Sequence, residues 1–401
     1  MPIMKLFILL THLIVLSACD QGSSATASVG TAPADSERAA MLDSAIQEIL
    51  DGQDIKTAGV GLIENGELIW AGYYGEESPG TPTSAATQFD TGSITKVVST
   101  ETVLRLSSDG LLELDEPMGA LWIDPDLEDD PRALQLTPRM VLNHTTGFPS
   151  RRSKTDNGKL QFLADPGTEF GYSGEGFEYL MRFVEAKLGA PFPELVEAEV
   201  FTPLGIIGAS FAYKKSNFQN VALSVDQDTG EFRTDWGYHC SVVSNSCLEE
   251  GAYSTSRNMT MTVESLAAFA ISVANADGYN AAMATDRNKV QSVKDRPMYY
   301  CDEPGVDNCP LEQGYGLGWE VLDYGDTQFI AHGGHDYSVL TAFGINTETR
   351  DGVIVLLNAR ELPSLRVMPR ILEALDPSTP LSQQYWGWLR YEESKLKTEA
   401  Q

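Results

Sequence analysis

A serine and a lysine stand three positions apart, as Ser93 and Lys96, in the stretch FDTGSITKVVSTETVLRL. The apolar spacing predicts a helix over residues 94–108, which Asp90 or Thr91 could cap. Residues three apart share a helix face, so the lysine amine can reach the serine hydroxyl. A serine becomes a strong nucleophile when an adjacent base takes its proton, and burial can make a lysine that base. The alternative is the polar edge of an ordinary helix, because so short a pattern also arises by chance.

A second polar segment, PGTEFGYSGEG, contains Tyr172 and precedes a predicted helix over residues 175–188. Its letters resemble the Gly-x-Ser-x-Gly turn of α/β-hydrolases, but Glu175 stands where the last glycine should be. No alternation of strands and helices surrounds it either. Ser173 is therefore rejected as a nucleophile.

The third segment is His332-Gly333-Gly334, on a predicted strand where glycine allows a ligand to approach the backbone closely. Together, the three segments resemble, in order, the motifs of the class C β-lactamase and D-alanyl-D-alanine carboxypeptidase superfamily, which includes esterases and peptidases. The stretches LTPRMVLNHTTGFP, YGLGWEV and GVIVLLN fall in the expected order as well. By this resemblance, which covers nearly the whole mature chain, the protein is identified as a serine hydrolase of that superfamily.

The resemblance implies a role for each matching residue. Ser93 would attack the substrate carbonyl and form an acyl-enzyme, while Lys96 and Tyr172 would move protons as a coupled pair, with the identity of the base left open. The backbone N–H groups of Ser93 and His335 would stabilise the oxyanion. No cofactor and no metal are expected, and the substrate would be a small ester, amide or D-amino-acid peptide.

Two positions depart from the family pattern. Gly174 replaces an asparagine, and His332 replaces the lysine of β-lactamases, so a fixed cation for a substrate carboxylate is missing. An esterase or peptidase-like enzyme is therefore preferred to a D-alanyl-D-alanine carboxypeptidase or a β-lactamase. If His332 meets a carboxylate, its charging would favour anionic substrates as the pH falls toward 6. A catalytically idle module that binds or senses cell-wall peptide is the alternative from another class.

Several other residues have both a functional and a structural interpretation. His332, His335 and Asp336 could be imagined as metal ligands, but their spacing matches no known metal motif and the family strand explains them better. His144 in LNHTTG is expected to shape its loop. Four aromatic residues could line a cleft or belong to the core: Trp236, Tyr238, Tyr315 and Trp319.

The amino terminus predicts export. Residues 1–18 have one positive charge and an apolar run that is short for a membrane span, which is typical of a signal peptide. The sequence LSAC resembles a bacterial lipobox, so cleavage before Cys19 and lipidation of that residue are expected, with ordinary secretion as the alternative. Asp20 points to the periplasmic face of the inner membrane. Residues 19–37 carry the lipidated cysteine and a small, polar, flexible tether.

Charge and cysteines exclude some partners. The net charge is −29 and no basic cluster occurs, so nucleic acid is a poor partner and membrane contact would rest on the lipid. In an exported protein the remaining cysteines favour disulfides, and the close spacing suggests Cys240–Cys247 and Cys301–Cys309. Other connectivities, and a zinc site, remain alternatives.

The expected fold is of the mixed α/β (α+β) class. Residues 38–50 predict an amphipathic helix, and Asn65-Gly66 between two β-rich runs predicts a hairpin. Short strands need partners, so residues 38–85 and 315–378 are predicted to form one antiparallel sheet with flanking helices. Residues 86–314 are predicted to form a mostly helical inserted domain that carries Ser93, Lys96 and Tyr172, and residues 379–401 a C-terminal tail.

Overall fold

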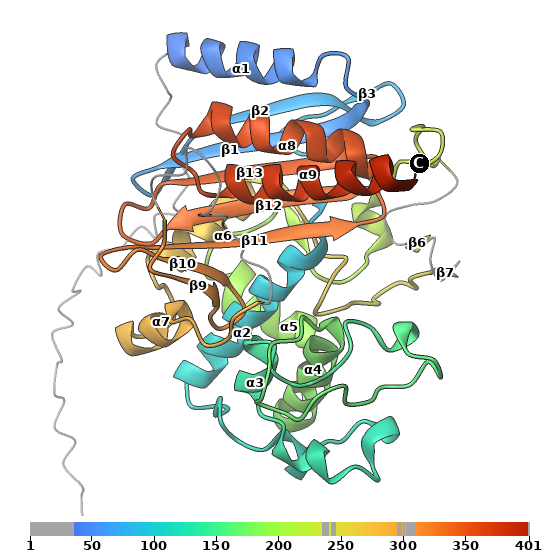
Figure 1. Cartoon of the computed structure of the whole chain (residues 1–401), viewed down its shortest axis with the longest axis vertical. Helices are drawn as coiled ribbons and strands as arrows, with labels where there is room; N and C mark the ends of the chain where they lie inside the picture. The colour runs from blue at the N-terminus through green and yellow to red at the C-terminus, as the bar shows by residue number, and fades with distance from the viewer. Residues whose placement is uncertain are drawn as a thin grey trace, which may run out of the picture.

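The centre of the molecule is an eight-stranded antiparallel sheet of order β3-β2-β1-β13-β12-β11-β10-β9 (Figure 1). The computed structural model describes residues 36–399, apart from 235–239, 242–245, 295–298, 300 and 302–308. The strands of this sheet are β1 (Ile55–Glu64), β2 (Glu67–Ser78), β3 (Thr81–Pro82), β9 (Glu312–Tyr315), β10 (Glu320–Asp323), β11 (Gln328–Asp336), β12 (Val339–Asn346) and β13 (Gly352–Ala359). This arrangement confirms the predicted α/β fold with an antiparallel sheet.

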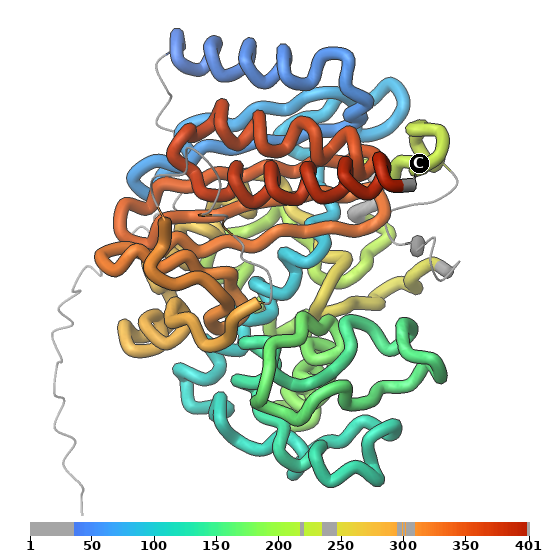
Figure 2. Tube along the Cα trace, in the orientation of Figure 1, coloured from blue at the N-terminus to red at the C-terminus, as the bar shows by residue number. Residues whose placement is uncertain are grey.

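The predicted hairpin joins β1 to β2. Asn65 and Gly66 both have positive φ angles, 51° and 78°, as a two-residue turn that matches the strand twist requires. On its other side β1 pairs with β13, with Val60 opposite Val355. Strands from the two ends of the chain therefore lie side by side, as the blue and orange-red tubes of Figure 2 show.

Both faces of the sheet are covered, and β13 shows how the sequence produces this. Val353, Val355 and Leu357 belong to one apolar cluster, and the alternate residues Ile354 and Leu356 belong to another. Successive side chains of a strand point to opposite faces, so a continuous apolar run is buried on both. The first cluster packs against α1 (Ser36–Leu50), α8 (Glu361–Leu375) and α9 (Leu381–Glu399). The second faces α6 (Val263–Ala274) and the helical region.

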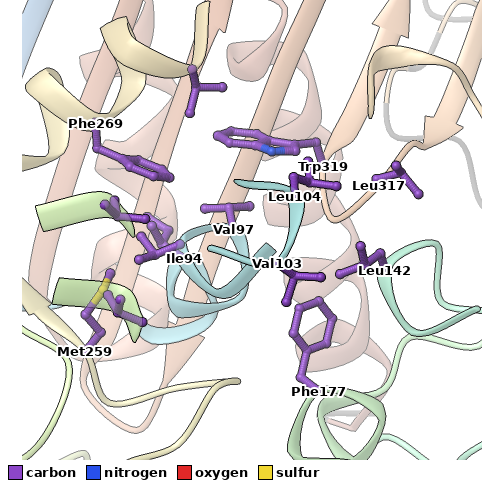
Figure 3. Close-up of a cluster of buried hydrophobic side chains, with 14 of the residues drawn as sticks. Ile94, Val97, Val103, Leu104, Leu142, Phe177, Met259, Phe269, Leu317 and Trp319 are labelled. Atoms are coloured by element: carbon purple, nitrogen blue, oxygen red, sulfur yellow. The ribbon is translucent and has the colours of Figure 1, made fainter. Parts of the chain in front are cut away.

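The helical region is built around α2 (Thr95–Ser108), whose residues from Thr95 to Leu106 are all buried. Its buried hydroxyls are satisfied locally, because Ser99, Thr100 and Thr102 donate to the carbonyl four residues earlier at 2.8 to 3.0 Å. Apolar side chains from several elements surround the helix, including Trp319 and Phe177 (Figure 3). The other helices here are α3 (Pro138–Leu142), α4 (Gly174–Leu188), α5 (Phe192–Val196) and α7 (Ala281–Asn288).

Short elements complete the helical region. A π-helical turn, Glu197–Phe201, continues α5. Short 3-10 segments lie at Gly92–Ile94, Met118–Ala120, Pro125–Leu127, Pro131–Gln135, Arg152–Lys154 and Lys215–Asn220. A small three-stranded sheet has the order β4 (Phe89–Asp90), β8 (Thr260–Met261) and β5 (Ala209–Ser210). A two-stranded ladder pairs β6 (Cys240–Ser241) with β7 (Ser246–Cys247).

The expectation of a C-terminal tail is wrong, because residues 381–399 form the helix α9. Tyr385 and Leu389 are buried in the apolar cluster between the sheet and the helices α1 and α8. Figure 1 shows α9 alongside α8. The aromatic and leucine residues at helical spacing in LSQQYWGWL explain why this segment docks. The sheet region also begins earlier than expected, at Glu312 rather than residue 315.

The predicted disulfides fall partly within the described residues. Cys301 and Cys309 form a disulfide, as predicted. Cys240 and Cys247 stand opposite each other in the β6–β7 ladder, but the side chain of Cys240 lies outside the described residues, so this bridge stays a prediction. The signal peptide, Cys19 and the tether also lie outside them, and no helix among the described residues is long and apolar enough to span a membrane.

Candidate active site

Ser93 lies in the 3-10 turn Gly92–Ile94, which leads directly into α2. The side chain of Asp90 accepts a hydrogen bond from the Gly92 amide at 2.8 Å, but Thr91, at the N-cap position of this turn, makes no side-chain cap. No side chain caps α2 itself, which corrects the expectation that Asp90 or Thr91 caps the helix. The half-buried Ser93 therefore sits at the amino-terminal end of a helix, where free N–H groups favour a nearby anion.

Lys96 extends from the first turn of α2 toward Ser93. Its Nζ lies 3.2 Å from Ser93 Oγ and donates a hydrogen bond to the Ser256 carbonyl at 2.8 Å. The residue is only 3% exposed, and among the described residues it forms no ion pair. Such a buried amine loses hydration without gaining a counter-charge in contact.

The pKa of Lys96 is accordingly lowered from its ordinary value to about 7, with burial as the main cause. Glu178 opposes this shift, and the guanidinium groups of Arg151 and Arg257 reinforce it. Near neutral pH the amine is therefore divided between its charged and neutral forms, which is the state that a proton acceptor needs.

Tyr172 lines the same cavity as Ser93 and lies close enough to it for a side-chain hydrogen bond. Burial raises the pKa of Tyr172 above its ordinary value, and the hydrogen bond to Ser93 offsets only part of this. The phenol is therefore protonated and can donate. The Lys96 amine lies 5.0 Å from the centre of the Tyr172 ring, so the three side chains form one cluster.

His144 holds Tyr172 in place. Its backbone is left-handed, with φ of 58°, and its ring centre lies 4.4 Å from that of Tyr172. Its Nδ1 accepts a hydrogen bond from the Ser173 amide at 3.2 Å, and burial keeps the pKa of His144 well below its ordinary value. These contacts agree with the expected loop-shaping role. The Ser173 hydroxyl caps α4 and donates a hydrogen bond to the Pro149 carbonyl. Both bonds are structural, which agrees with the rejection of Ser173 as a nucleophile.

The His332-Gly333-Gly334 run lies on β11 and brings its backbone against the Ser93 turn. Gly92 has a φ of 54°, and a Cβ built on it would lie 3.1 Å from the His335 nitrogen. A Cβ on Gly334 would lie 2.1 Å from the Thr91 carbonyl oxygen, so only glycine fits there. This close approach places the backbone of residue 335 beside the Ser93 turn, as an oxyanion hole would need.

His332 is buried at 3% exposure, and its Nδ1 lies 2.7 Å from the Gly333 carbonyl oxygen. Its Nε2 is buried without a hydrogen-bond partner among the described residues. Burial lowers the pKa of His332 to about 4, although nearby Glu320 opposes the shift. Burial therefore disfavours the imidazolium form of His332 near pH 6 in the free site, and the expectation that His332 charges when it meets a substrate carboxylate stays a prediction.

These residues line a cavity of about 750 Å³. Its wall includes an ion pair between Lys294 and Glu320, and Glu320 also accepts a hydrogen bond from Gln384 of α9 at 3.1 Å. Burial acts to raise the pKa of Glu320, but Lys294 and His332 lower it overall, so the carboxylate is charged. Further lining residues come from loops, from the ends of β9 and β11, and from the C-terminal helices: Arg151, Arg257, Tyr315, Asp336, Glu361, Tyr385 and Trp388.

The sequence analysis missed several of these lining residues. Ser256 supplies the carbonyl that binds Lys96, and its hydroxyl donates to Glu178 of α4 at 2.7 Å. A Cβ built on Gly174 would lie 3.3 Å from the Ser256 hydroxyl, so that hydroxyl occupies part of the space left by the missing asparagine. No motif marks Ser256 or Glu178; only their polarity near predicted site segments could have drawn attention to them.

The remaining predicted residues divide between cavity, core and elsewhere. Tyr315 lines the cavity, whereas Trp319 is fully buried in the core (Figure 3). Trp236 and Tyr238 lie outside the described residues. His335 lies 3.5 Å from Glu361. Across the described chain, no three His, Cys, Asp or Glu side chains converge as metal ligands.

Similar proteins carry the same fold. The chain aligns with the octameric penicillin-binding protein homologue from Pyrococcus abyssi at a TM-score of 0.66 and 19% identity, covering 86% of this chain and 78% of that one. The hydrolase EstCE1, with promiscuous acyltransferase activity, aligns at 0.65 and 18% identity, covering 84% and 98%. At these identities the likeness concerns the fold.

Sequence relatives match over shorter stretches. Fimbrial assembly protein FimD (serogroup D) of Dichelobacter nodosus is 28% identical over 174 residues, which cover 37% of this chain and 42% of that protein. Lovastatin esterase of Penicillium rubens is 27% identical over 155 residues, covering 30% and 38%. The chain thus matches less than half the length of either relative. The model of the Beta-lactamase family, in contrast, matches residues 42–375, nearly the whole described chain. The protein therefore belongs to the Beta-lactamase family.

Proposed function

We propose that the protein is a serine hydrolase that works through an acyl-enzyme on Ser93. The observation that carries this proposal is the 3.2 Å separation of Ser93 Oγ and Lys96 Nζ at the wall of a cavity of about 750 Å³. The lysine is buried and its pKa is about 7, so a neutral amine is available beside the hydroxyl.

The proposed reaction has two halves. In acylation, Ser93 Oγ bonds to the substrate carbonyl carbon while its proton passes to Lys96, and Tyr172 donates a proton to the departing alkoxide or amine. The carbonyl oxygen gains charge next to the backbone N–H groups of Ser93 and His335. In deacylation, Tyr172 takes a proton from a water whose oxygen bonds to the acyl carbon. The bond between that carbon and Ser93 Oγ breaks, and Lys96 returns its proton to Ser93.

A small ester is the favoured substrate. His332 is neutral at physiological pH and residue 174 has no side chain, so neither can hold a substrate carboxylate as a lysine or an amide would. The similarity to proteins named EstCE1 and lovastatin esterase supports the same choice. D-alanyl-D-alanine carboxypeptidase and β-lactamase activities are the alternatives within the family.

The test of the nucleophile is covalent labelling with a fluorophosphonate, followed by intact-mass and peptide mass spectrometry. One adduct is expected, on Ser93, and none in Ser93→Ala, which should fold normally because only a hydroxyl is removed. An adduct on Ser173 would overturn the assignment. A folded protein that does not label would instead support an idle module that binds cell-wall peptide.

The test of the substrate class is a panel of short-chain esters, cephalosporins, penicillins and D-amino-acid peptides. A charge-assisted contact contributes about 1.5–3 kcal/mol and a neutral hydrogen bond about 0.5–1.5. Without both, anionic β-lactams should lose about 30- to 1000-fold in kcat/KM, at about 1.4 kcal/mol per factor of ten. Esters should therefore exceed cephalosporins, with penicillins poorest. Efficient penicillin turnover at neutral pH would contradict the ester proposal.

We also propose that Cys19 carries a lipid and holds the enzyme at the periplasmic face of the inner membrane. The LSAC sequence and the following aspartate support this placement. Labelling of cells with an alkyne-tagged fatty acid should mark the wild-type protein and leave Cys19→Ala unmarked. Recovery of the unmodified wild-type protein in the soluble periplasmic fraction would contradict it.

A further inference from the structure

We infer that Glu178 is a positioning residue for Lys96, which acts across Ser256 to hold the amine and to stabilise its ammonium form during catalysis. This inference rests on the proposed function, because it concerns the base of that reaction. It assigns a role to a carboxylate that no motif of the sequence marks.

The contacts of Glu178 define a short polar chain. Glu178 Oε1 accepts hydrogen bonds from the hydroxyls of Ser254 and Ser256, at 2.5 and 2.7 Å. The Ser254 hydroxyl also accepts a bond from the Ser256 amide at 3.2 Å. The Ser256 carbonyl then accepts from Lys96 Nζ at 2.8 Å. The Glu178 carboxylate thus binds the Ser256 hydroxyl directly and the Ser256 amide through Ser254. It holds in place the residue whose carbonyl orients Lys96.

Neither charge in this chain is neutralised by direct contact. Among the described residues, Lys96 forms no ion pair, and neither does Glu178. One serine, Ser256, separates the buried amine of Lys96 from the half-buried carboxylate of Glu178. Their charges attract each other without a salt bridge. Glu178 is also the strongest influence that favours the charged form of Lys96.

This arrangement suits a base that must change its charge in each turnover. A direct salt bridge would keep Lys96 protonated and unable to accept the Ser93 proton. With no carboxylate nearby, the ammonium formed in acylation would be left in a buried site without compensation. A carboxylate one residue away avoids both extremes.

Gly174 makes the arrangement possible. It opens α4, the helix that carries Glu178, and a Cβ on it would lie 3.3 Å from both the Ser256 hydroxyl and the Ser150 carbonyl oxygen. A larger side chain would compete with Ser256 for this space. The Ser256 hydroxyl, held by its hydrogen bond to Glu178, thus lies in the space beside Lys96 that an asparagine side chain at position 174 would occupy.

Several other charged or titratable groups face Lys96, and the test must separate Glu178 from them. Arg151 and Arg257, on two loops, disfavour its ammonium form, and Asp336 of β11 favours it. The rings of Tyr172, His144 and His332 also lie nearby. Of these groups, in the part of the chain that the structure describes, Glu178 alone is hydrogen-bonded to the side chain of Ser256, the residue whose carbonyl binds Lys96.

The test is Glu178→Gln, which keeps the shape and most hydrogen bonds but removes the charge. The acidic limb of the rate of fluorophosphonate labelling should move to lower pH by about half to one unit, because the ammonium form of Lys96 loses a favourable charge. The plateau rate should fall by about tenfold, since the ammonium formed in acylation is less stable. A merely structural role would lower the plateau without moving the limb.

Two variants serve as controls. Ser256→Ala removes a hydrogen bond and keeps the Glu178 charge, so its plateau should fall while its limb stays in place. Glu185→Gln alters another carboxylate of α4, which binds the Phe192 amide at 3.0 Å outside the cavity, and should leave the profile unchanged. A Glu178→Gln limb at the wild-type position would overturn the inference and leave the proposed function intact.

A second readout does not depend on activity. With 13Cε-labelled lysine, the Lys96 signal, assigned by its absence in Lys96→Met, can be titrated by NMR in wild type and in Glu178→Gln. The titration midpoint should be lower in the variant. Equal midpoints would refute the role of Glu178, whereas absence of wild-type labelling with a shifted midpoint would refute the proposed function alone.

Discussion

The helix α2 carries three buried charged residues, Lys96, Glu101 and Arg105, and the first two lie in opposite electrostatic surroundings. Lys96, in its first turn, is 3% exposed and forms no ion pair among the described residues. Glu101, five residues later, is fully buried, lies 3.5 Å from the guanidinium of Arg287, and accepts hydrogen bonds from Trp319 at 2.9 Å and Tyr279 at 2.7 Å. Lys96 has no counter-charge in contact and can lose its proton, whereas the charge of Glu101 is compensated by an ion pair and two hydrogen bonds.

The difference separates a charge that holds the structure from one that can do chemistry. A buried ion with a counter-charge and good hydrogen bonds stays ionised, and removing its partner costs stability. A buried ion without a counter-charge shifts its pKa instead, and for Lys96 the shift ends near neutral pH. Four experiments can break or sharpen this comparison.

The largest expected effect is on stability, at the Glu101 end of α2. Glu101→Ala leaves the Arg287 guanidinium buried without its partner, which should lower the free energy of unfolding by about 3–5 kcal/mol. Urea denaturation followed by circular dichroism measures this directly. A loss below about 1 kcal/mol would mean that the Glu101 network does not hold the helix.

The next effect is on rate, at the Lys96 end. Lys96→Met and Tyr172→Phe should each lower kcat/KM by at least ~10²-fold, the usual scale for losing a positioned acid or base. The double variant should be little worse than either single one if the pair works as a unit. Lys96→Met should unfold at an equal or higher urea concentration, because it removes an uncompensated buried charge. Marked destabilisation would show that Lys96 is compensated after all.

A smaller effect concerns pH. Lys96 must be neutral to accept a proton, and its pKa is about 7, so activity should be lost as the pH falls through that value. Each further unit should lower kcat/KM about tenfold, because the neutral fraction falls by that factor. Rates of ester hydrolysis from pH 5 to 9 test this. Full activity retained at pH 5.5 would exclude Lys96 as the base.

The smallest effect is expected at His332. Its pKa of about 4 keeps it neutral from pH 8 to 5.5, so the ratio of kcat/KM for a carboxylated ester over its neutral analogue should change less than about twofold in that range. His332→Gln, which keeps a neutral hydrogen-bonding group, should change that ratio equally little. A rise in the ratio through pH 6 that disappears in the variant would support the charged-histidine interpretation.

Much of the architecture could be read from the chain itself. The Asn65-Gly66 turn predicted a hairpin, and the need of short strands for partners predicted one antiparallel sheet from both ends of the chain; the structure confirms both. Local turn chemistry and strand periodicity act over a few residues, so they are visible without tertiary contacts. The spacing of Ser93 and Lys96 predicted their pairing in the same way, whereas Tyr172 was predicted from the resemblance of the motif order to a known family.

Other features depended on contacts between distant parts of the chain. The aromatic spacing of α9 was present in the sequence, but its docking beside the cavity was not predictable from a segment that also looked charged. The Ser256 hydroxyl meets Glu178 across 78 positions, and no motif links the two. Trp319 could have lined the cleft or the core, and only packing around α2 placed it in the core.

The sequence by itself determined which groups can do chemistry here: a hydroxyl, an amine and a phenol in a recognisable order, with a histidine in place of a cation. The tertiary structure decided their protonation. The pKa values of Lys96 and His332 reflect burial first, and burial is created by elements far apart in the chain. The type of a side chain is fixed by the sequence at one position, whereas the free energy of its charged form depends on all the groups packed around it.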